Sequence, residues 1–482
     1  MDNYTFFQRL AMPAFLFTLF FTFCRHKNPG GALLIPGCIA LCIYLCYSIK
    51  KINMSIKKGS IVFLAFILLF GISCFLTGYE TFWFYSHTGI LVSATAFLIY
   101  NAYDSKKWSF VQQLAALCKL IGFTTIEVPA PISGLIAASK VGKAKKLLQV
   151  FIALAIALPL MLIIVALLVS ADAIFGSLVD GVFGKFSFGN IISIMFMSTF
   201  VFFLSYCSIK ALLKEDNSDL QEMQNTKFAD PFIGIIITSL ISVVYLIFSN
   251  VQIFGLFLGK MSLPEGLTYS EYARKGFFQL MFVCFINLII VLICKTIFRK
   301  NVVLNTFLMI ISVSTGIMLA SSAFKMYMYT SVYGLTRLRF TTFAGQITIA
   351  VLLLGIMINV LFPNFGLYRF GLITILTGYM LLSFSHMDYW IVKYNVTREN
   401  IDTDYISWLS TDAVPALVEY DDFSLLNEYY NYHEANYSNI YELLYFDEYT
   451  GDYRIDYVYG DKTQAHRDTF RTFNISHYMY TK

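Results

Sequence analysis

Charged residues are scarce in this chain. Asp, Glu, Lys and Arg make up 13% of its 482 residues, whereas 57% of the residues are hydrophobic. A soluble domain carries about 25% charged residues, so the shortage argues against an ordinary soluble fold. Long apolar runs recur along most of the chain, and a run of about 18 or more with few charges is typical of a membrane-spanning helix. The net charge of +5 is therefore not a nucleic-acid signal.

Cysteine is missing from the last part of the chain, because none of the nine cysteines lies beyond Cys294. This distribution does not indicate a disulfide framework. Cys38, Cys42 and Cys46 share one helix face, and we interpret them as packing residues rather than as soft-metal ligands. The sequence also lacks a Walker loop, HExxH, GxSxG and a CxxC pair, which weakens ATPase, metalloprotease, hydrolase and redox functions. We predict no cofactor, no metal ligand and no catalytic residue.

Eleven apolar stretches are candidate membrane spans. They are 6–24, 32–49, 61–78, 82–100, 147–170, 190–213, 231–258, 277–297, 302–322, 342–362 and 369–388. The first is the weakest, because Gln8, Arg9 and Pro13 interrupt it. We predict an all-α polytopic membrane protein, a helical bundle of about 11 transmembrane helices with a small extracytoplasmic C-terminal tail that is α+β or helical.

Basic residues predict the orientation of these spans. One set of alternate loops is rich in Lys and Arg, including Lys50, Lys51, Lys57 and Lys58, the lysines of 106–146, those of 210–227, and Lys295, Arg299 and Lys300. The other set carries fewer. Because cytoplasmic loops are enriched in Lys and Arg, we predict a cytoplasmic N-terminus and an extracytoplasmic C-terminus in a bacterial cytoplasmic membrane.

The spans divide the chain into four predicted segments. They are N-terminal transmembrane helices at 1–100, a cytoplasmic or interfacial connector at 101–146, the main transmembrane bundle at 147–390, and an acidic, tyrosine-rich tail at 391–482. In the tail, the pattern predicts a capped helix start in 401–420 with a turn at Pro415, then a helix over 421–445. The alternation in 453–457 predicts a short strand. We expect the aromatic residues of the tail to pack on the membrane domain.

Two loops on the lysine-poor side are exceptions, because they carry arginines. Together with their tyrosines and one glutamate, they give the candidate ligand-binding residues Arg274, Arg337, Arg339, Tyr269, Tyr272, Tyr329, Tyr333 and Glu271. Tyr329, Tyr333 and Arg337 recur every four residues and share a helix face if Gly334 does not break the helix. The functional hypothesis is a vestibule whose guanidinium groups bind an anion, such as a lipid phosphate or an acidic envelope polymer. The preferred alternative is an aromatic belt with bases that snorkel to the headgroups or pair with the acidic tail.

His386 and Asp388 lie at the outer end of the last predicted span. They suggest a proton relay or a metal pair, but a hydrogen bond at a helix end is the simpler interpretation. Asn and Gln side chains within the spans are expected to form packing hydrogen bonds between helices.

Four segments resemble a bacterial family of polytopic membrane proteins. They are LPEGLTYSEYARKGFF at 263–278, YGLTRLRF at 333–340, DYISWLSTDAVPAL at 404–417 and FNISHYM at 473–479. The family is catalogued as domain of unknown function 4173, with a related group numbered 4153. The resemblance runs from about Ser170 to the end of the chain. It implies an integral membrane protein of the bacterial envelope and brings no established activity, so no functional residue is carried over.

Three hypotheses for function remain. The preferred one is a non-enzymatic envelope protein that recognises a partner or signal through its outer loops and tail. The second is a transporter or flippase of an anionic or lipid-linked molecule. The third is a membrane enzyme that acts on a lipid-linked substrate. The partners implied are the lipid bilayer, an anionic lipid or envelope polymer, and a membrane protein that contacts residues 391–482.

Overall fold

A computed structural model gives the fold. It describes residues 2–25, 31–77, 80–103, 110–140, 164, 188–213, 229–254, 269–398, 401–420, 422–436, 443–447 and 452–456. The predicted span at 147–170, apart from residue 164, lies outside the described residues, and so does the segment at 473–479.

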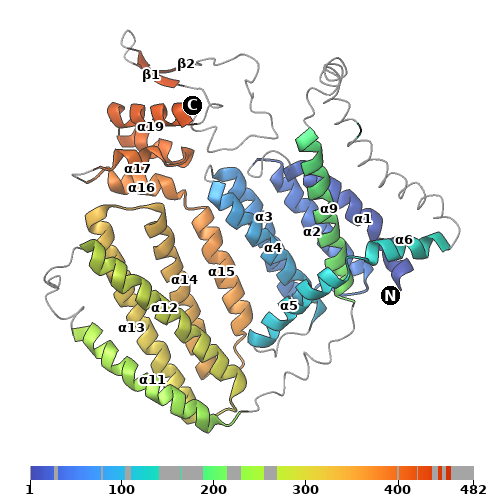
Figure 1. The fold of residues 1–482 in the computed structure, drawn as a ribbon, viewed down its shortest axis with the longest axis horizontal. Coiled ribbons are helices and arrows are strands. Elements are labelled where there is room, and N and C mark those ends of the chain that lie inside the picture. The colour runs from blue at the N-terminus through green and yellow to red at the C-terminus, as the bar shows by residue number, and fades with distance from the viewer. Residues whose placement is uncertain are drawn as a thin grey trace.

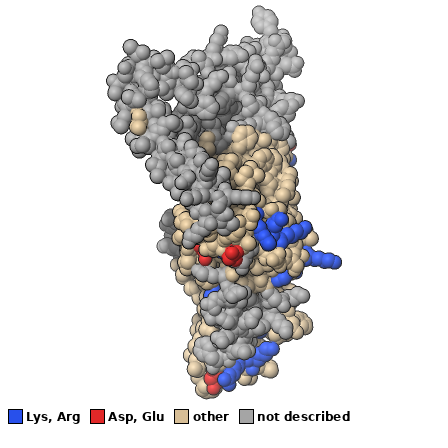
Figure 2. All heavy atoms as spheres, turned by 90° about the vertical axis from the view of Figure 1, so that its right-hand side faces the viewer, with Lys and Arg blue, Asp and Glu red and all other residues tan. Residues whose placement is uncertain are grey.

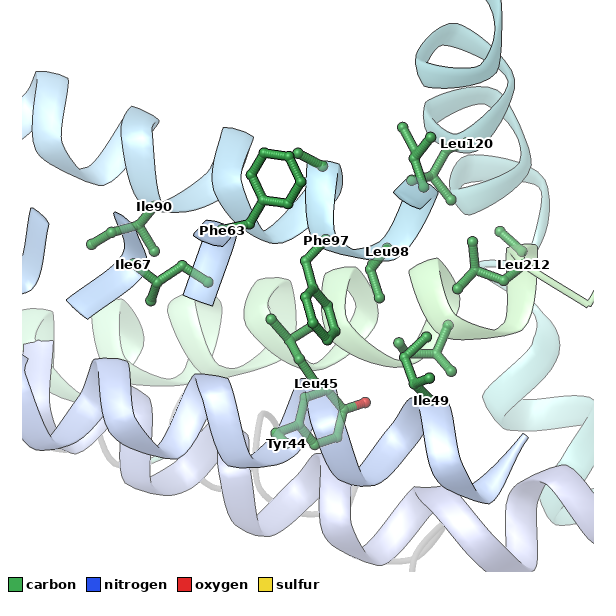
Figure 3. Packing of buried hydrophobic residues seen from close by; sticks show 14 of the residues in the cluster. Tyr44, Leu45, Ile49, Phe63, Ile67, Ile90, Phe97, Leu98, Leu120 and Leu212 are labelled. Atoms are coloured by element: carbon green, nitrogen blue, oxygen red, sulfur yellow. The ribbon is translucent and has the colours of Figure 1, made fainter. Parts of the chain in front are cut away.

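The first helices form an N-terminal sub-bundle (Figure 1). Its members are α1 (Asn3–Arg25), α2 (Leu34–Lys51), the short η1 (Lys58–Ser60), α3 (Ile61–Leu76), α4 (Glu80–Ala102), α5 (Phe110–Ile126), α6 (Ala130–Lys140) and α9 (Phe188–Ala211). One apolar core runs through all the α-helices of this set. Figure 3 shows Phe97 of α4 directed at Leu45 and Tyr44 of α2, and all three side chains are buried. Tyr44 also stacks on Phe17 of α1 with 4.8 Å between ring centroids, so close aromatic packing holds the sub-bundle together.

A C-terminal sub-bundle lies beside the first one (Figure 1). It consists of α11 (Pro231–Gln252), α12 (Tyr269–Ile297), α13 (Val302–Tyr333) and α14 (Arg337–Leu361). Its apolar core is separate from that of the N-terminal sub-bundle. The next helix, α15 (Leu367–Ser383), packs against α14 on one side and against α3 and α4 on the other, so it joins the two sub-bundles.

Side-chain caps mark where several of these helices begin. Asp230 accepts a hydrogen bond from the Phe232 amide, and Pro231 follows it at the first turn of α11. Asn301 accepts hydrogen bonds from the amides of Val303 and Leu304 and so caps α13. Such side chains satisfy amide groups that have no partner within the helix, which is why short polar residues precede the apolar runs.

The described loops fall at two ends of the molecule. The lower end in Figure 1 holds the N-terminus of α1, the link from α2 to α3, and the ends of α4, α9, α12 and α14. Lys57 lies there and donates hydrogen bonds to the carbonyls of Tyr100 and Tyr103. Figure 2 shows most of the Lys and Arg of one face gathered in two groups in its lower half. The orientation that the basic loops predict stays a prediction.

Nine of the described helices are long and apolar enough to cross a membrane, and two bent helix pairs raise the number to 11. The chain is therefore a multi-pass integral membrane protein. The 11 candidates are not the 11 predicted ones. The pair α5–α6, bent by 50°, comes from the segment that we predicted as a connector, whereas the predicted span at 147–170 lies outside the described residues.

The structure also groups the helices differently from the predicted division at residues 100 and 147. Ala116 and Leu120 of α5 are buried in the same core as α1–α4, because the apolar face of this helix packs inward. Tyr206 and Cys207 of α9 belong to that core as well. The sequence pattern shows which stretches are apolar, but it does not show which distant helices they contact.

A cap lies over the upper end of the C-terminal sub-bundle and α15 (Figure 1), and we define it as residues 386–436. Its elements are α16 (Met387–Asn395), α17 (Thr403–Ser407), η5 (Thr411–Ala413), α18 (Val414–Tyr420) and α19 (Phe423–Asn436). The chain bends by 59° between α15 and α16, so the straight helix of the last predicted span ends at Ser383 rather than at residue 388. The cap has its own buried core, which includes Leu417 and Tyr429 and also takes in Phe82 of α4.

Beyond α17, the tail differs from its predicted elements. Pro415 lies in the first turn of α18, where its missing amide costs nothing, rather than at a turn. The helix predicted over 421–445 ends at Asn436. Strand β1 (Leu443–Asp447) pairs antiparallel with β2 (Asp452–Asp456), which overlaps the strand predicted at 453–457.

Helix α13 is longer than its predicted span of 302–322, because it continues to Tyr333. At 1.5 Å per residue its 32 residues extend about 48 Å, whereas the hydrocarbon core of a bilayer is about 30 Å thick. The upper part of α13 therefore projects beyond the hydrocarbon and reaches the cap.

Close packing of α14 against α15 gives a first prediction. A Cβ atom at Gly355 of α14 would overlap the ring of Phe370 of α15, whereas a Cβ atom at Gly345 of the same helix meets nothing within 4 Å. We expect Gly355→Leu to lower the unfolding free energy by about 1–3 kcal/mol relative to Gly345→Leu, because it overpacks this contact. Thermal unfolding of the two purified variants measures the difference. Equal melting temperatures would contradict the observed contact.

Candidate functional site

Gly334 separates two helices at the upper end of the molecule. Its φ of 80° lies in the left-handed region, and its amide donates to the Thr330 carbonyl to end α13. Thr336 then caps α14 through the Arg339 amide. Gly334 therefore breaks the helix, so the condition on which Tyr329, Tyr333 and Arg337 would share one helix face is not met.

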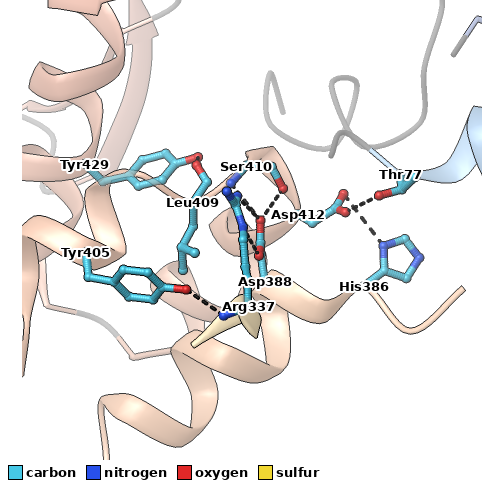
Figure 4. Close-up of polar contacts among 9 residues, drawn as sticks. All are labelled: Thr77, Arg337, His386, Asp388, Tyr405, Leu409, Ser410, Asp412 and Tyr429. Carbon is cyan, nitrogen blue, oxygen red and sulfur yellow. Dashed lines mark hydrogen bonds and ion pairs between the residues drawn. The ribbon is translucent and has the colours of Figure 1, made fainter. Parts of the chain in front are cut away.

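Arg337, the first residue of α14, forms a bidentate ion pair with Asp388 of α16 (Figure 4). Arg337 Nε lies 2.9 Å from Asp388 Oδ1, and Arg337 Nη2 lies 2.6 Å from Oδ2. The Asp388 side chain is 1% exposed. A buried carboxylate is stable only when a cation and hydrogen-bond donors replace its lost hydration, and the guanidinium fork supplies both.

The cap completes the coordination of Asp388. The amide and the hydroxyl of Ser410 both donate to Asp388 Oδ2, at 2.8 and 2.6 Å. The Tyr405 hydroxyl accepts a hydrogen bond of 2.7 Å from the Arg337 amide. Three segments of the chain therefore meet at one carboxylate: the start of α14, the start of α16 and the loop between α17 and η5 (Figure 4).

Backbone clamps reinforce this junction. The Asn395 side chain accepts from the Leu335 amide at 2.7 Å and donates to the Leu335 carbonyl at 2.8 Å. A Cβ atom at Gly334 would lie 2.8 Å from Asn395 Oδ1, so glycine is needed for this approach. Arg398 donates to the carbonyls of Thr330, Ser331 and Val332, which are among the last of α13. A cation at this position also interacts favourably with the helix dipole.

A second acid, Asp412 of η5, ties the cap to the N-terminal sub-bundle. Its Oδ2 accepts a hydrogen bond of 2.6 Å from the hydroxyl of Thr77, the residue after α3, and its Oδ1 lies 3.7 Å from His386 Nδ1 (Figure 4). The neighbouring Asp412 carboxylate raises the pKa of His386, because it favours the protonated ring. His386 and Asp388 thus have different partners, and they do not form the proton relay or metal pair that the sequence suggested.

Arg339 is held by a different set of groups. Its Nη1 donates to the Tyr333 and Gly334 carbonyls, and its guanidinium lies over the Tyr329 ring at 4.1 Å from the centroid. The Tyr329 and Tyr333 rings are 5.1 Å apart. These contacts bring Arg339, Tyr329 and Tyr333 together, but they do not include Arg337, whose fork faces Asp388, and the role of these residues in binding a ligand stays a prediction.

The other predicted site residues lie in the first turns of α12. Tyr269, Glu271, Tyr272 and Arg274 are part of this helix, and their side chains lie outside the described residues. Their role in a ligand-binding vestibule therefore stays a prediction. Among the described residues, no group of three or more His, Cys, Asp or Glu side chains is placed to hold a metal ion.

Several residues of the junction were not singled out from the sequence. Tyr405, Ser410 and Asp412 lie within the segment at 404–417 that carries the family resemblance, which was the available signal. Asn395 and Arg398 follow the last helix of the membrane domain and had no such signal. Asp388 and Asp412 are paired with residues from other segments of the protein. These contacts fix the cap on the bundle.

The match to a known family covers this junction. The model of a family described as Domain of unknown function (DUF4153) matches residues 38–420. The chain belongs to this family. The match lies with the 4153 group rather than with 4173, which the sequence resemblance had placed first, and it extends over the N-terminal spans as well. No curated protein and no solved structure matches the chain.

The ion pair at the centre of the junction gives a second prediction. Arg337→Gln leaves the buried Asp388 carboxylate without its cation, which should cost about 3 kcal/mol. We expect faster hydrogen exchange across 403–420, because this part of the cap depends on the pair. Lys393→Gln is the control, since Lys393 of α16 has only exposed contacts, with Glu419 and with the Tyr389 hydroxyl, and should change little. Equal exchange in the two variants would refute a structural role for Arg337.

Proposed function

We propose that this chain is a bacterial cell-envelope membrane protein whose cap lies on the extracytoplasmic side and recognises a partner. The basic lower end supports this orientation, because cytoplasmic loops are enriched in Lys and Arg. By contrast, the described cap segment 401–436 contains no Lys or Arg at all. Acidic segments do not oppose translocation, so an acidic cap is compatible with the outer side.

The cap is suited to recognition because it is fixed at its base and presents aromatic rings at its surface. The Trp408 side chain is 64% exposed and stacks on Tyr432 of α19, with 6.3 Å between ring centroids. Two residues after Trp408, Ser410 binds the buried Asp388, so the position of this tryptophan is set by the junction. A pre-positioned aromatic pair gives binding energy without a large ordering cost, and it is the observation that carries the proposal.

The charge around the aromatic pair indicates the chemistry of the partner. Asp404 precedes Trp408 by four residues, and Glu428 precedes Tyr432 by four residues on α19. Both acids are exposed. Aromatic rings beside carboxylates fit a basic, partly apolar surface, so we propose a membrane or envelope protein with such a segment.

The alternatives have less support. A transporter needs a polar path, but several polar side chains of the C-terminal sub-bundle bond to one another across helices. Asn287 of α12 accepts from the Tyr245 hydroxyl and donates to Thr315, as packing hydrogen bonds between membrane helices do. An enzyme needs convergent acids and bases, and His386 and Asp388 are each engaged with a different residue of the protein.

The orientation can be tested by cysteine labelling of cells. Asn431→Cys would place a thiol on the exposed surface of the cap, and Lys300→Cys would place one at the lower end. Cys118, the exposed native cysteine, would first be replaced by Ser. We expect an impermeant maleimide to label position 431 in intact cells and position 300 only after permeabilisation. Labelling of position 300 but not of position 431 in intact cells would place the cap in the cytoplasm and contradict the proposal.

Recognition can be tested by complementation of a strain that lacks the gene. We expect Trp408→Ala to lower partner affinity roughly 30-fold, which corresponds to about 2 kcal/mol, and to fail in complementation at normal membrane abundance. Trp390→Ala is the control, because this ring is also half-exposed but lies on α16. Full complementation by Trp408→Ala, together with failed complementation by Gln346→Leu inside the C-terminal sub-bundle, would favour a transport function instead.

A further inference from the structure

The bend between α15 and α16 contains a histidine with a rare backbone conformation. His386 has φ 45° and ψ 57°, in the left-handed region, and it directly precedes α16. Residues other than glycine adopt this conformation rarely, and it persists only where the surrounding contacts hold it. The chain bends by 59° across residues 384–386, which we define as the hinge of the cap. The contacts of His386 therefore help to decide how the cap is placed.

A buried carboxylate connects the hinge to the N-terminal sub-bundle. Asp412 of η5 is 2% exposed, and its Oδ1 lies 3.7 Å from His386 Nδ1. Its Oδ2 accepts the hydrogen bond of 2.6 Å from the Thr77 hydroxyl. Figure 4 shows His386 and Thr77 approaching this acid from two different segments of the chain. One acid thus bridges a residue of the hinge and the residue that follows α3.

The Thr77 end of this bridge is fixed to the N-terminal sub-bundle. The Thr77 carbonyl accepts a hydrogen bond of 3.0 Å from the indole nitrogen of Trp83 in α4. One turn earlier in α3, the buried Ser73 hydroxyl lies 3.0 Å from that of Ser86, which lies 3.4 Å from that of Ser383 in α15. These contacts tie α3, α4 and α15 together close to the hinge. An opening of the bridge is therefore expected to move the cap rather than Thr77.

Among the described residues, Asp412 is the charged group that lies against His386. The His386 side chain is 41% exposed, so it exchanges a proton with water while it faces a buried acid. The other acidic, basic and histidine residues on the elements packed around the hinge are Arg337 with Asp388, Lys393 with Glu419, Arg339, Arg369, His87, and Glu80, whose side chain lies outside the described residues. Each of the described ones has its own partners elsewhere.

We propose that His386, Asp412 and Thr77 form a pH-sensitive latch that holds the cap on the N-terminal sub-bundle. When His386 carries a proton, its positive charge faces the buried carboxylate and stabilises both the bridge to Thr77 and the left-handed hinge. When the proton leaves to water, the carboxylate loses this cation and the hinge loses one of the contacts that hold it. The segment around Asp412 then separates more readily from Thr77, so the latch is a local charge change with an effect on the whole cap.

Acidic conditions should favour the closed latch. The adjacent Asp412 carboxylate raises the pKa of His386 above the ordinary value of about 6.5. The charged pair therefore contributes its full stabilisation below about pH 6.5, and this is lost as the pH rises through the higher pKa of His386 in the folded protein. The cap should be held more tightly at about pH 6 than at about pH 9.

Hydrogen exchange of the purified full-length protein in detergent tests the latch, with each rate divided by the intrinsic rate at the same pH. We expect the wild type to exchange roughly fivefold faster over 403–420 at about pH 9 than at about pH 6, the size of effect of a partly exposed ion pair. His386→Asn removes the titrating charge but tolerates the left-handed backbone, so it should exchange at the faster rate at both pH values. His433→Asn in α19 is the matched control and should keep the wild-type pH dependence.

A second variant keeps the test decisive if His386→Asn does not fold. Asp412→Asn retains an oxygen for the Thr77 hydroxyl and removes the negative charge, so it should also abolish the pH dependence. The double variant should behave like either single one, because both substitutions remove the same pair. Wild-type pH dependence in either single variant, or its absence from the wild type, would overturn the latch. The measurement involves no partner, so its outcome is independent of the recognition function proposed for the cap.

Discussion

The buried carboxylate of Asp388 is the constraint on which the upper end of this protein depends. With 1% of its side chain exposed, Asp388 has lost its water and must obtain a cation and donors from the protein. Arg337 and Ser410 supply them from segments that lie 51 residues before and 22 residues after it. Removal of Arg337 leaves a buried charge without compensation, and removal of Ser410 leaves the carboxylate with fewer donors, so this ion pair couples the membrane domain to the cap.

The same constraint explains why α13 ends where it does. The turn at 334–336 must bring Arg337 to Asp388, and the left-handed Gly334 makes that turn possible next to Asn395. Arg398 then occupies the free carbonyls at the end of α13, which would otherwise lack partners beyond the hydrocarbon. Cap residues thus satisfy the backbone groups that the turn exposes, and the turn supplies the cation that the cap requires.

The apolar runs predicted most of the helices, because hydropathy and length are sufficient to define a span. The pattern did not predict which helices pack together, since α9 and α15 contact helices far away in the sequence. For the site, the arginines in a lysine-poor loop singled out Arg337 and Arg339. They gave no indication that Asp388 is the partner of Arg337. An ion pair between positions 337 and 388 depends on the bend after Ser383 and the stop at Gly334, and neither geometry follows from residue types alone.

Two arginines at the upper end differ in how their charge is balanced. Arg337 faces a carboxylate from the same chain, so its charge is already balanced and an added anion would have to displace Asp388 at the cost of a buried ion pair. Among the described residues, Arg25 lies against the Met197 thioether, and its Nε has no hydrogen-bond partner.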